Sequence, residues 1–161
     1  MAALNNLPLL TFIAESSREN RSIPSIADLS QELGISTASV REQLEVLKQM
    51  GFVDVKPKTG IQARAFSLTK PVLLAMKYGL KLDQDLFLNF SDLRRHLESS
   101  FWYESVPKLR ASDMDCLQAI IKVAEQKING DPIQVPMNEH RDFHLRFFKP
   151  LENCIVVDLM E

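Results

Sequence analysis

An early part of the chain switches from helical to strand periodicity at a single point, and this switch restricts the folds that the chain can adopt. Two short helical segments come first, each preceded by a serine and followed by a glycine. Ser25 and Ser36 are suited to cap these helices through their hydroxyl oxygens. Gly34 and Gly51 are suited to end them, because glycine adopts the left-handed conformation at little cost. After Gly51 the apolar residues alternate, which is the period of a strand.

Two strand-like runs, 52–55 and 61–64, follow the switch. The letters KPKTG join them, and proline and glycine suit a hairpin connection. Helical spacing over 7–19 predicts a further helix before the two capped ones. The order of helix, short helix, turn, longer helix and hairpin predicts a winged helix-turn-helix domain over residues 1–66.

Beyond residue 66 the strand signals stop, and every periodic segment is helical. We expect a linker helix within 67–80 and an all-α domain over 81–161. Asp83 is expected to cap a long helix that continues to Leu109. The helices expected after it start near residues 112, 138 and 152. The fold class is therefore mainly α, a winged helix with a small β-hairpin wing followed by a helical bundle.

The composition of the 161 residues is that of an ordinary globular protein, with 45% hydrophobic and 25% charged residues and a net charge of −2. It excludes disordered, collagen-like and low-complexity chains. No apolar run approaches the roughly 18 residues that a membrane helix needs. Cys116 and Cys154 lack the CxxC and zinc-ribbon spacings, so we expect reduced, buried thiols in a cytoplasmic protein.

The charge is neutral over residues 1–66, which carry seven lysines and arginines and seven acidic residues. A modest basic excess lies within 41–64, where five cations face three carboxylates. A typical DNA-binding domain is more basic, so charge alone supports a nucleic-acid partner only weakly.

Three sequence stretches resemble one family of proteins. The run IPSIADLSQELGISTASVREQLEVLKQMGFVDVKPKTG at 23–60 resembles the winged-helix domain of GntR-family transcription regulators, most closely the FadR subfamily pattern LPSERELAExLGVSRxxVREALxxLexxGLVxxxxxxG. FSDLRRHLE at 90–98 resembles the first effector-domain helix of that subfamily. HRDFHLRFFKPLENCIVVDLME at 140–161 resembles its DxxFHxxLxxxxGNxxLxxLxx stretch.

This resemblance implies a DNA-binding transcription regulator, not an enzyme, that acts as a homodimer on a double-stranded operator. It also implies that residues 81–161 form an effector domain of the FCD type that binds a small carboxylate. Because the family's domain continues further, we expect the effector domain here to be truncated at its C-terminal end. No HExxH glutamate, nucleophile elbow or phosphate loop indicates an enzyme.

A recognition helix places its N-terminal end in the major groove, where hydroxyls and the helix dipole favour phosphate. Ser36, Thr37 and Ser39 lie at that end, and Arg41 lies one turn further, within reach of a phosphate or a guanine edge. The alternative is that Ser36 is only a cap and Arg41 only a solvated charge. The remaining candidate DNA-binding residues are Ser25 at the first cap and, with Lys56, the residues of the hairpin tip, Lys58, Thr59 and Gly60.

Two positions depart from the family pattern. Ala27 and Thr37 stand where the family usually has arginines that contact DNA. Losing two charge-assisted contacts is expected to cost a few kcal/mol of affinity, so the operator should differ. The alternative function is a winged-helix protein-interaction module that has lost specific DNA binding.

His140 and His144 lie four residues apart on an expected helix, so both imidazoles project from one face. Such a pair can chelate a divalent transition metal such as zinc or nickel, although an unaided HxxxH pair is more often incidental. The resemblance places His144 at a metal-binding histidine and His140 where the family usually has aspartate. The family's two further histidines would lie beyond Glu161.

Arg94 matches a family arginine that points into the effector cavity, where it would pair with a carboxylate effector. The alternative is a surface arginine balanced by Glu98 at i+4. His96 is expected at the surface, and Asn153 is expected to cap the last helix. The aromatic residues expected in the core are Phe101, Trp102, Phe143, Phe147 and Phe148.

Overall fold

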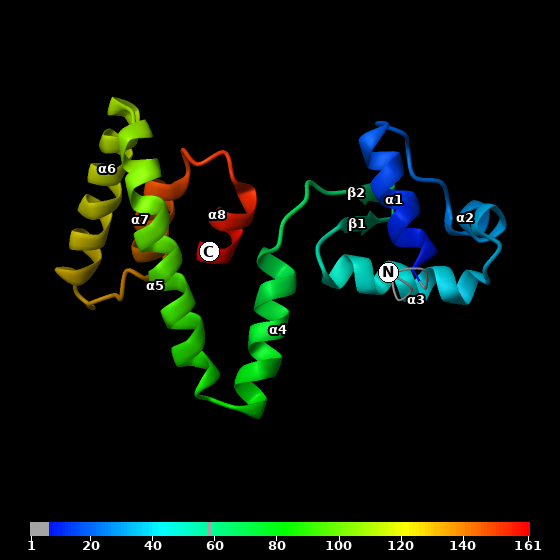
Figure 1. The fold of residues 1–161 in the computed structure, drawn as a ribbon, viewed down its shortest axis with the longest axis horizontal. Coiled ribbons are helices and arrows are strands. Elements are labelled where there is room, and N and C mark those ends of the chain that lie inside the picture. The colour runs from blue at the N-terminus through cyan, green and yellow to red at the C-terminus, as the bar shows by residue number, and fades with distance from the viewer. Residues whose placement is uncertain (1–6, 58) are drawn as a thin grey trace. The chain divides into compact units, whose positions relative to one another are not determined.

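The computed structural model describes residues 7–57 and 59–161 and divides into two compact units, Met1–Leu74 and Ala75–Glu161 (Figure 1). The first unit holds three helices and a hairpin: α1 (Pro8–Arg18), α2 (Ile26–Leu33), α3 (Thr37–Gln49), β1 (Val53–Lys56) and β2 (Gly60–Ala63). The following elements are helical: α4 (Thr69–Leu82), α5 (Leu86–Ser105), the 3-10 turn η2 (Val106–Lys108), α6 (Ala111–Ile128), α7 (Met137–Phe148) and α8 (Cys154–Met160). Among the described residues, none of these helices has both the length and the apolar character needed to span a membrane.

The caps predicted for the helix-turn-helix are confirmed. The Ser25 hydroxyl accepts the Asp28 N–H at 3.3 Å, and the Ser36 hydroxyl accepts the Ser39 N–H at 3.1 Å. Gly34 follows α2 with a φ of 63°, and Gly51 follows α3 with a φ of 78°. Gly34 and Ser36 together set a short turn between α2 and α3, which is the geometry of a helix-turn-helix.

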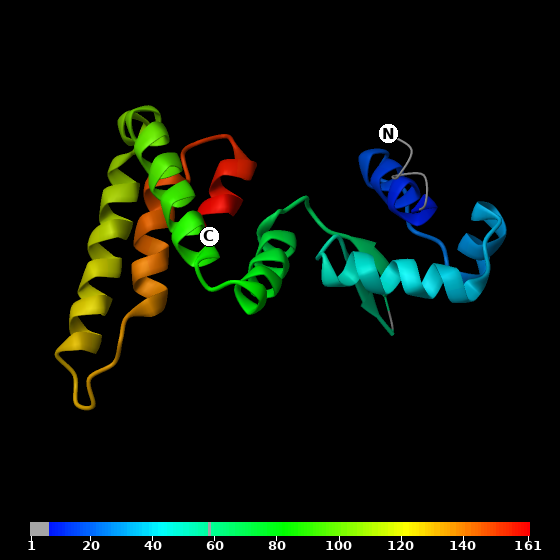
Figure 2. The same cartoon turned by 60° about the horizontal axis from the view of Figure 1, so that its bottom comes forward.

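The hairpin is antiparallel, with Val53 opposite Ala63 and Lys56 opposite Gly60, and it lies at the C-terminal end of α3 (Figure 2). Both strands are offset by one residue from the predicted runs. The first strand starts later because Phe52 donates its N–H to the Leu47 carbonyl at 2.9 Å, in the turn that ends α3. The second starts at Gly60, because Gly60 pairs with Lys56. The mainly α fold class, with an N-terminal winged helix and a hairpin wing, is confirmed.

One apolar core holds the first unit together. Its buried side chains come from every helix and from both strands, and they are Leu9, Ile13, Leu29, Val40, Leu44, Leu47, Val53 and Ile61. Because α3 contributes three of them, its opposite face stays free for a partner.

The buried Gln43 side chain ties α3 to the start of α1. Its Oε1 accepts the Leu9 N–H at 3.1 Å, and its Nε2 donates to the Ser39 hydroxyl at 3.3 Å. The first turn of α1 has no side-chain cap of its own. Gln43 therefore replaces a cap from a distant part of the sequence.

In the helical unit, α6 and α7 pack side by side, and α5 and α8 also pack against α7 (Figure 1). The buried cluster is formed by Phe148, Leu151, Val156 and Met160. Two ion pairs join α6 to α7. Lys127 Nζ lies 2.7 Å from Glu139 Oε1, and Arg146 Nη2 lies 2.7 Å from Asp113 Oδ1.

Several local predictions for this unit are wrong. Asp83 does not cap α5; its carboxylate accepts the Asp85 N–H at 2.9 Å in the preceding turn. The helix ends at Ser105 instead of Leu109, and the 3-10 turn that follows it contains Pro107, which has no N–H to donate.

Both cysteines are free, but they are exposed and not buried as predicted. Cys116 precedes the buried Leu117 on α6 and lines an open pocket with residues of α7 and α8, and Cys154 is the first residue of α8. A small apolar residue next to a buried one on a helix points in a different direction, and composition does not reveal this. Asn153 does cap α8, since its Oδ1 accepts the Val156 N–H at 3.3 Å.

Candidate nucleic-acid interface and helical pocket

The N-terminal end of α3 presents polar side chains to solvent. Ser36, Thr37 and Arg41 are exposed, and Ser39 is half-buried. The hydroxyl oxygens of Ser36 and Ser39 act as acceptors, for the Ser39 N–H and for Gln43 respectively. An accepting hydroxyl keeps its own proton, so both groups can still donate to a phosphate.

Ser25 is engaged differently from the other candidate residues. Its hydroxyl accepts the Asp28 N–H and also donates to the Asp28 carboxylate at 2.7 Å. This reciprocal arrangement resembles a capping box and uses the hydroxyl proton within α2. A contact of Ser25 with DNA stays a prediction.

The tip of the hairpin is exposed at Thr59 and Gly60, and Lys56 is exposed at the end of β1. Lys58 lies outside the described residues. Further back on the hairpin, Arg64 Nη1 lies 3.1 Å from Asp54 Oδ2, so these two charges balance each other. The tip can therefore approach a duplex backbone without a nearby carboxylate of the hairpin repelling it.

The exposed face of α3 carries charges of both signs. Glu45 accepts hydrogen bonds from Gln49 at 2.8 Å and from Lys48 at 3.2 Å, and together these bonds lower the pKa of its carboxyl. Lys48 is thereby balanced within the helix. Arg41 is the cation of α3 nearest to the capped end, and Glu42 is exposed beside it.

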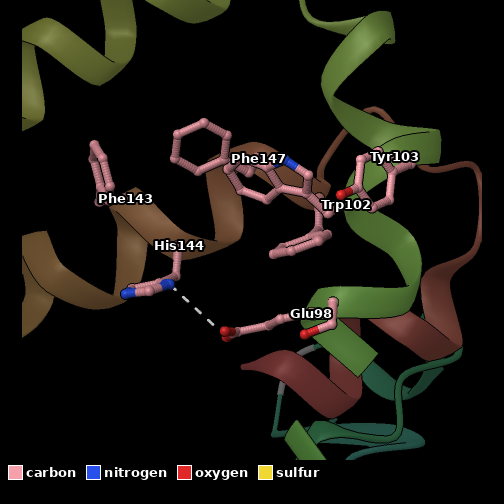
Figure 3. Close-up of a pocket in the computed structure, with 8 residues that line it drawn as sticks. Glu98, Trp102, Tyr103, Phe143, His144 and Phe147 are labelled. Atoms are coloured by element: carbon pink, nitrogen blue, oxygen red, sulfur yellow. Dashed lines mark ion pairs between the residues drawn. The ribbon is translucent and has the colours of Figure 1, made fainter. Parts of the chain in front are cut away.

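The helical unit has an open pocket of about 570 Å³ between α5 and α7 (Figure 3). Aromatic rings dominate its lining, which consists of Glu98, Ser99, Trp102, Tyr103, Phe143, His144, Phe147 and Phe148. The volume lies within the range of small-molecule sites. Most of the lining is apolar, and Glu98 and His144 are its ionisable polar groups apart from the Tyr103 phenol.

The aromatic rings contact one another along the pocket wall. The ring centroids of Trp102 and Phe147 are 5.1 Å apart, and those of Phe143 and Phe147 are also 5.1 Å apart. The prediction of a core position is confirmed for Phe148, which is 2% exposed, whereas Trp102 is 41% exposed. Trp102 lies on the side of α5 that faces the pocket, where no further helix of the described chain covers it.

His140 and His144 lie on the same face of α7, as their spacing predicts, with ring centroids 4.7 Å apart. Figure 3 shows His144 directed toward Glu98, and its Nδ1 lies 3.8 Å from Glu98 Oε1. Within residues 7–57 and 59–161, no group of three or more His, Cys, Asp or Glu side chains is arranged to hold a metal ion. Metal binding by His140 and His144 stays a prediction.

Arg94 Nε donates to Glu98 Oε1 at 2.9 Å, one turn along α5. Glu98 lines the pocket and Arg94 does not. The same carboxylate therefore faces both Arg94 and His144. Its ion pair with Arg94 is the i,i+4 alternative that the sequence analysis gives for this arginine. His96 is exposed, as predicted.

Sequence reasoning missed the role of Glu98 as a pocket residue. The signal is present in the spacing, because Glu98 and Trp102 are four residues apart and share a face of α5. What the spacing does not show is that α7 lies opposite this face.

Comparisons with known proteins agree with the winged helix. Residues 16–61 match the model of the iron dependent repressor N-terminal DNA binding domain. Among solved structures, Streptococcus agalactiae GntR is similar with a TM-score of 0.58 and 18% sequence identity, over 99% of this chain and 78% of that one. No curated protein matches the chain. At this identity the structural likeness shows the fold alone. The chain is therefore classed as a winged-helix protein with a GntR-like fold.

Proposed function

We propose that this chain is a transcription regulator that binds duplex DNA through its winged helix. The observation that carries the proposal is the match of residues 16–61 to a DNA-binding domain, over a segment whose helix-turn-helix leaves the N-terminal end of α3 exposed. An exposed helix end of this kind fits the major groove, about 12 Å wide in B-DNA.

Each exposed group has a distinct part in this proposal. Arg41 reaches a guanine edge or a phosphate, and the hydroxyls of Ser36 and Thr37 donate to the backbone near the positive end of the α3 dipole. Thr59 and Gly60 bring the wing against the adjacent backbone. Two copies of the chain would read two half-sites, which compensates for the arginines absent at Ala27 and Thr37.

The finer assignment is to the FadR subfamily of GntR regulators, with an effector domain that binds a small organic acid. Support comes from the sequence stretches that resemble the subfamily and from the pocket between α5 and α7. In this proposal Arg94 binds the effector carboxylate, for which its side chain must leave Glu98 and turn into the pocket that it does not line in this structure. Effector binding would then alter the spacing of the two winged helices in a homodimer and so the affinity for the operator.

His140 and His144 would hold a divalent transition metal beside this pocket. Support comes from their i,i+4 spacing on one face of α7, with ring centroids 4.7 Å apart. A bound metal would supply a positive charge for the effector carboxylate. Substituting both histidines with alanine and measuring bound zinc or nickel tests this; unchanged metal content would refute it.

A mobility shift of genomic fragments with the full chain, at low and at moderate salt, tests the regulator proposal. We expect a subset of fragments to be retained at moderate salt, because specific contacts persist when counterion release weakens. If no fragment is retained at either salt concentration, the chain does not bind DNA.

A second function is favoured by one observation, the exposed Glu42 and Glu45 on α3. Carboxylates on a recognition face repel phosphate and suit a protein partner. The same mobility shift separates the two functions, since a protein-interaction module retains no fragment.

A further inference from the structure

A second cavity, separate from the aromatic pocket, lies between the start of α6 and the end of α7. It has a volume of about 560 Å³, and half of its lining residues are cationic. The charged side chains around it are Lys108, Arg110, Asp113, Arg146, Lys149 and Glu152. They come from three parts of the chain. Lys108 and Arg110 lie in and just after η2, Asp113 lies in the first turn of α6, and the other three lie at the end of α7 and in the loop beyond it.

The cavity is positive, although the whole chain is negative. Four cations and two carboxylates line it, which gives a local charge of +2, against −2 for the chain. Charges of one sign that converge on a concave site attract the opposite sign and raise its local concentration. The composition of the site therefore favours an anion.

Arg146 is held in place by an ion pair with Asp113. Its Nη2 lies 2.7 Å from Asp113 Oδ1, and the two side chains are 20% and 15% exposed. The other Asp113 oxygen accepts the Arg110 N–H at 2.8 Å, so each oxygen of this carboxylate has a partner within the chain. Within the described part of the chain, Arg146 Nε is buried without a hydrogen-bond partner. A buried donor of this kind is costly unless another group meets it.

Arg110 and Lys149 supply exposed positive charge at the rim of the cavity. Both are exposed, and no carboxylate of residues 7–57 or 59–161 lies within ion-pair distance of either side chain. Lys108 is already paired, with its Nζ 3.0 Å from Glu104. The Ser112 hydroxyl and the first N–H groups of the 18-residue helix α6 add neutral donors beside them.

We propose that this cavity binds a dianionic phosphoryl group, either as inorganic phosphate or as part of a phosphorylated small molecule. With Lys108 paired to Glu104, the excess positive charge comes from Arg110, Arg146 and Lys149, and it favours the dianion of a phosphate monoester at neutral pH. The planar forks of Arg110 and Arg146 suit paired phosphate oxygens better than a point charge does. The site is independent of the winged helix and of the aromatic pocket, so it stands whether or not the chain regulates transcription.

Calorimetric titration of the full chain with inorganic phosphate, pyrophosphate and a sugar phosphate tests the proposal, with acetate as the carboxylate comparison. The test variant is Arg110→Gln with Lys149→Gln. Its matched control is Lys77→Gln with Lys122→Gln, two exposed lysines whose loss changes the net charge equally. All four residues are exposed, so we expect both variants to keep the far-ultraviolet circular dichroism of the unmodified chain.

We expect at least one phosphoryl probe to bind the unmodified chain and the control with equal affinity. We expect the test variant to bind this probe about tenfold more weakly, because charge-assisted hydrogen bonds are lost. Tighter binding of the sugar phosphate than of inorganic phosphate identifies a metabolite as the ligand, and the reverse order identifies the free ion.

Three results would overturn the proposal. The first is that no phosphoryl probe binds at millimolar concentration. The second is that the test variant and the control lose affinity equally, which reduces the effect to net charge. The third is that acetate binds as well as phosphate with the same dependence on Arg110 and Lys149, which makes the site one for carboxylates.

Discussion

The hydrogen bond from Leu9 to Gln43 is expected to hold the recognition helix against α1. Leu9 is fully buried, so its N–H has no access to water, and Gln43 Oε1 is its acceptor at 3.1 Å. Pro8, the first residue of α1, has no N–H, and the Leu10 N–H reaches the Leu7 carbonyl at 3.0 Å. Among residues 8–10, the Leu9 N–H is thus the donor without a local acceptor, and Gln43 accepts it.

The perturbation is Gln43→Met, which keeps the length and volume of the side chain and removes the acceptor. A buried donor left without a partner costs about 1–3 kcal/mol. The matched control is Gln49→Met on the same helix, where the exposed amide only donates to Glu45 at 2.8 Å. For an exposed position we expect a change within about 0.5 kcal/mol.

Native-state hydrogen exchange of the Leu9 amide measures this directly. Fluorescence cannot replace it, because Trp102 is the sole tryptophan and lies in the helical unit. Gln43→Met should speed exchange of the Leu9 amide roughly fivefold to hundredfold, which corresponds to the expected loss of free energy. Gln49→Met should leave it unchanged.

Two outcomes would contradict this reasoning. Unchanged exchange at Leu9 in Gln43→Met would mean that the hydrogen bond does not protect the start of α1. Equal acceleration by Gln43→Met and Gln49→Met would mean that the effect comes from methionine in α3 and not from the lost acceptor.

The remaining predictions concern one cap, one ion pair and one core residue. Ser36→Ala should destabilise the winged helix by about 1 kcal/mol in a urea titration followed by circular dichroism, because α3 loses its cap; no change would show that the cap is redundant. A hydrogen bond from Lys127 holds the pKa of Glu139 below its ordinary 4.5, so the pair stabilises the fold above that pH and the contribution is lost as the pH falls through the lowered pKa. The Tm of the unmodified chain should therefore fall more steeply with acidification than that of Glu139→Gln, and parallel curves would contradict this. Phe148→Ala should cost about 3–5 kcal/mol and shift the emission of Trp102, whose ring centroid is 6.5 Å from that of Phe148; an unchanged urea midpoint would show that Phe148 is not a core residue.

The parts of the fold that sequence predicts well are those set by neighbours in the chain. Ser25, Ser36 and Asn153 cap their helices because a hydroxyl or amide oxygen reaches an N–H three residues ahead. Gly34 and Gly51 end theirs because the left-handed region is open to glycine. These interactions need no knowledge of the rest of the molecule.

The parts that sequence misses depend on which helices pack together. Ile121 and Ile128 continue the apolar spacing of α6, which favours inward positions, yet they are 43% and 51% exposed. Among the described helices it is α7 that covers α6, so the outer edge of the stripe stays uncovered. The Leu9–Gln43 bond spans 34 positions and has no local signal at all.

The candidate site divides in the same way. The pairing of Arg94 with Glu98 follows from i,i+4 spacing, and so does the shared face of His140 and His144. The approach of His144 to Glu98 follows from the packing of α7 against α5, which the sequence does not specify.

Binding of duplex DNA by the full chain tests the central claim most directly. The chain itself is used to enrich a duplex from a random library, and this duplex is then labelled. The labelled duplex is titrated with the unmodified chain, with Arg41→Gln and with the control Arg18→Gln, and binding is followed by fluorescence anisotropy at several salt concentrations. We expect affinity to fall with salt, and Arg41→Gln to weaken binding about tenfold and to reduce the salt slope by about one contact. Arg18, whose side chain is 78% exposed at the end of α1, should have no such effect. Failure to enrich any duplex, or equal affinity of the two variants, would contradict recognition through the N-terminal end of α3.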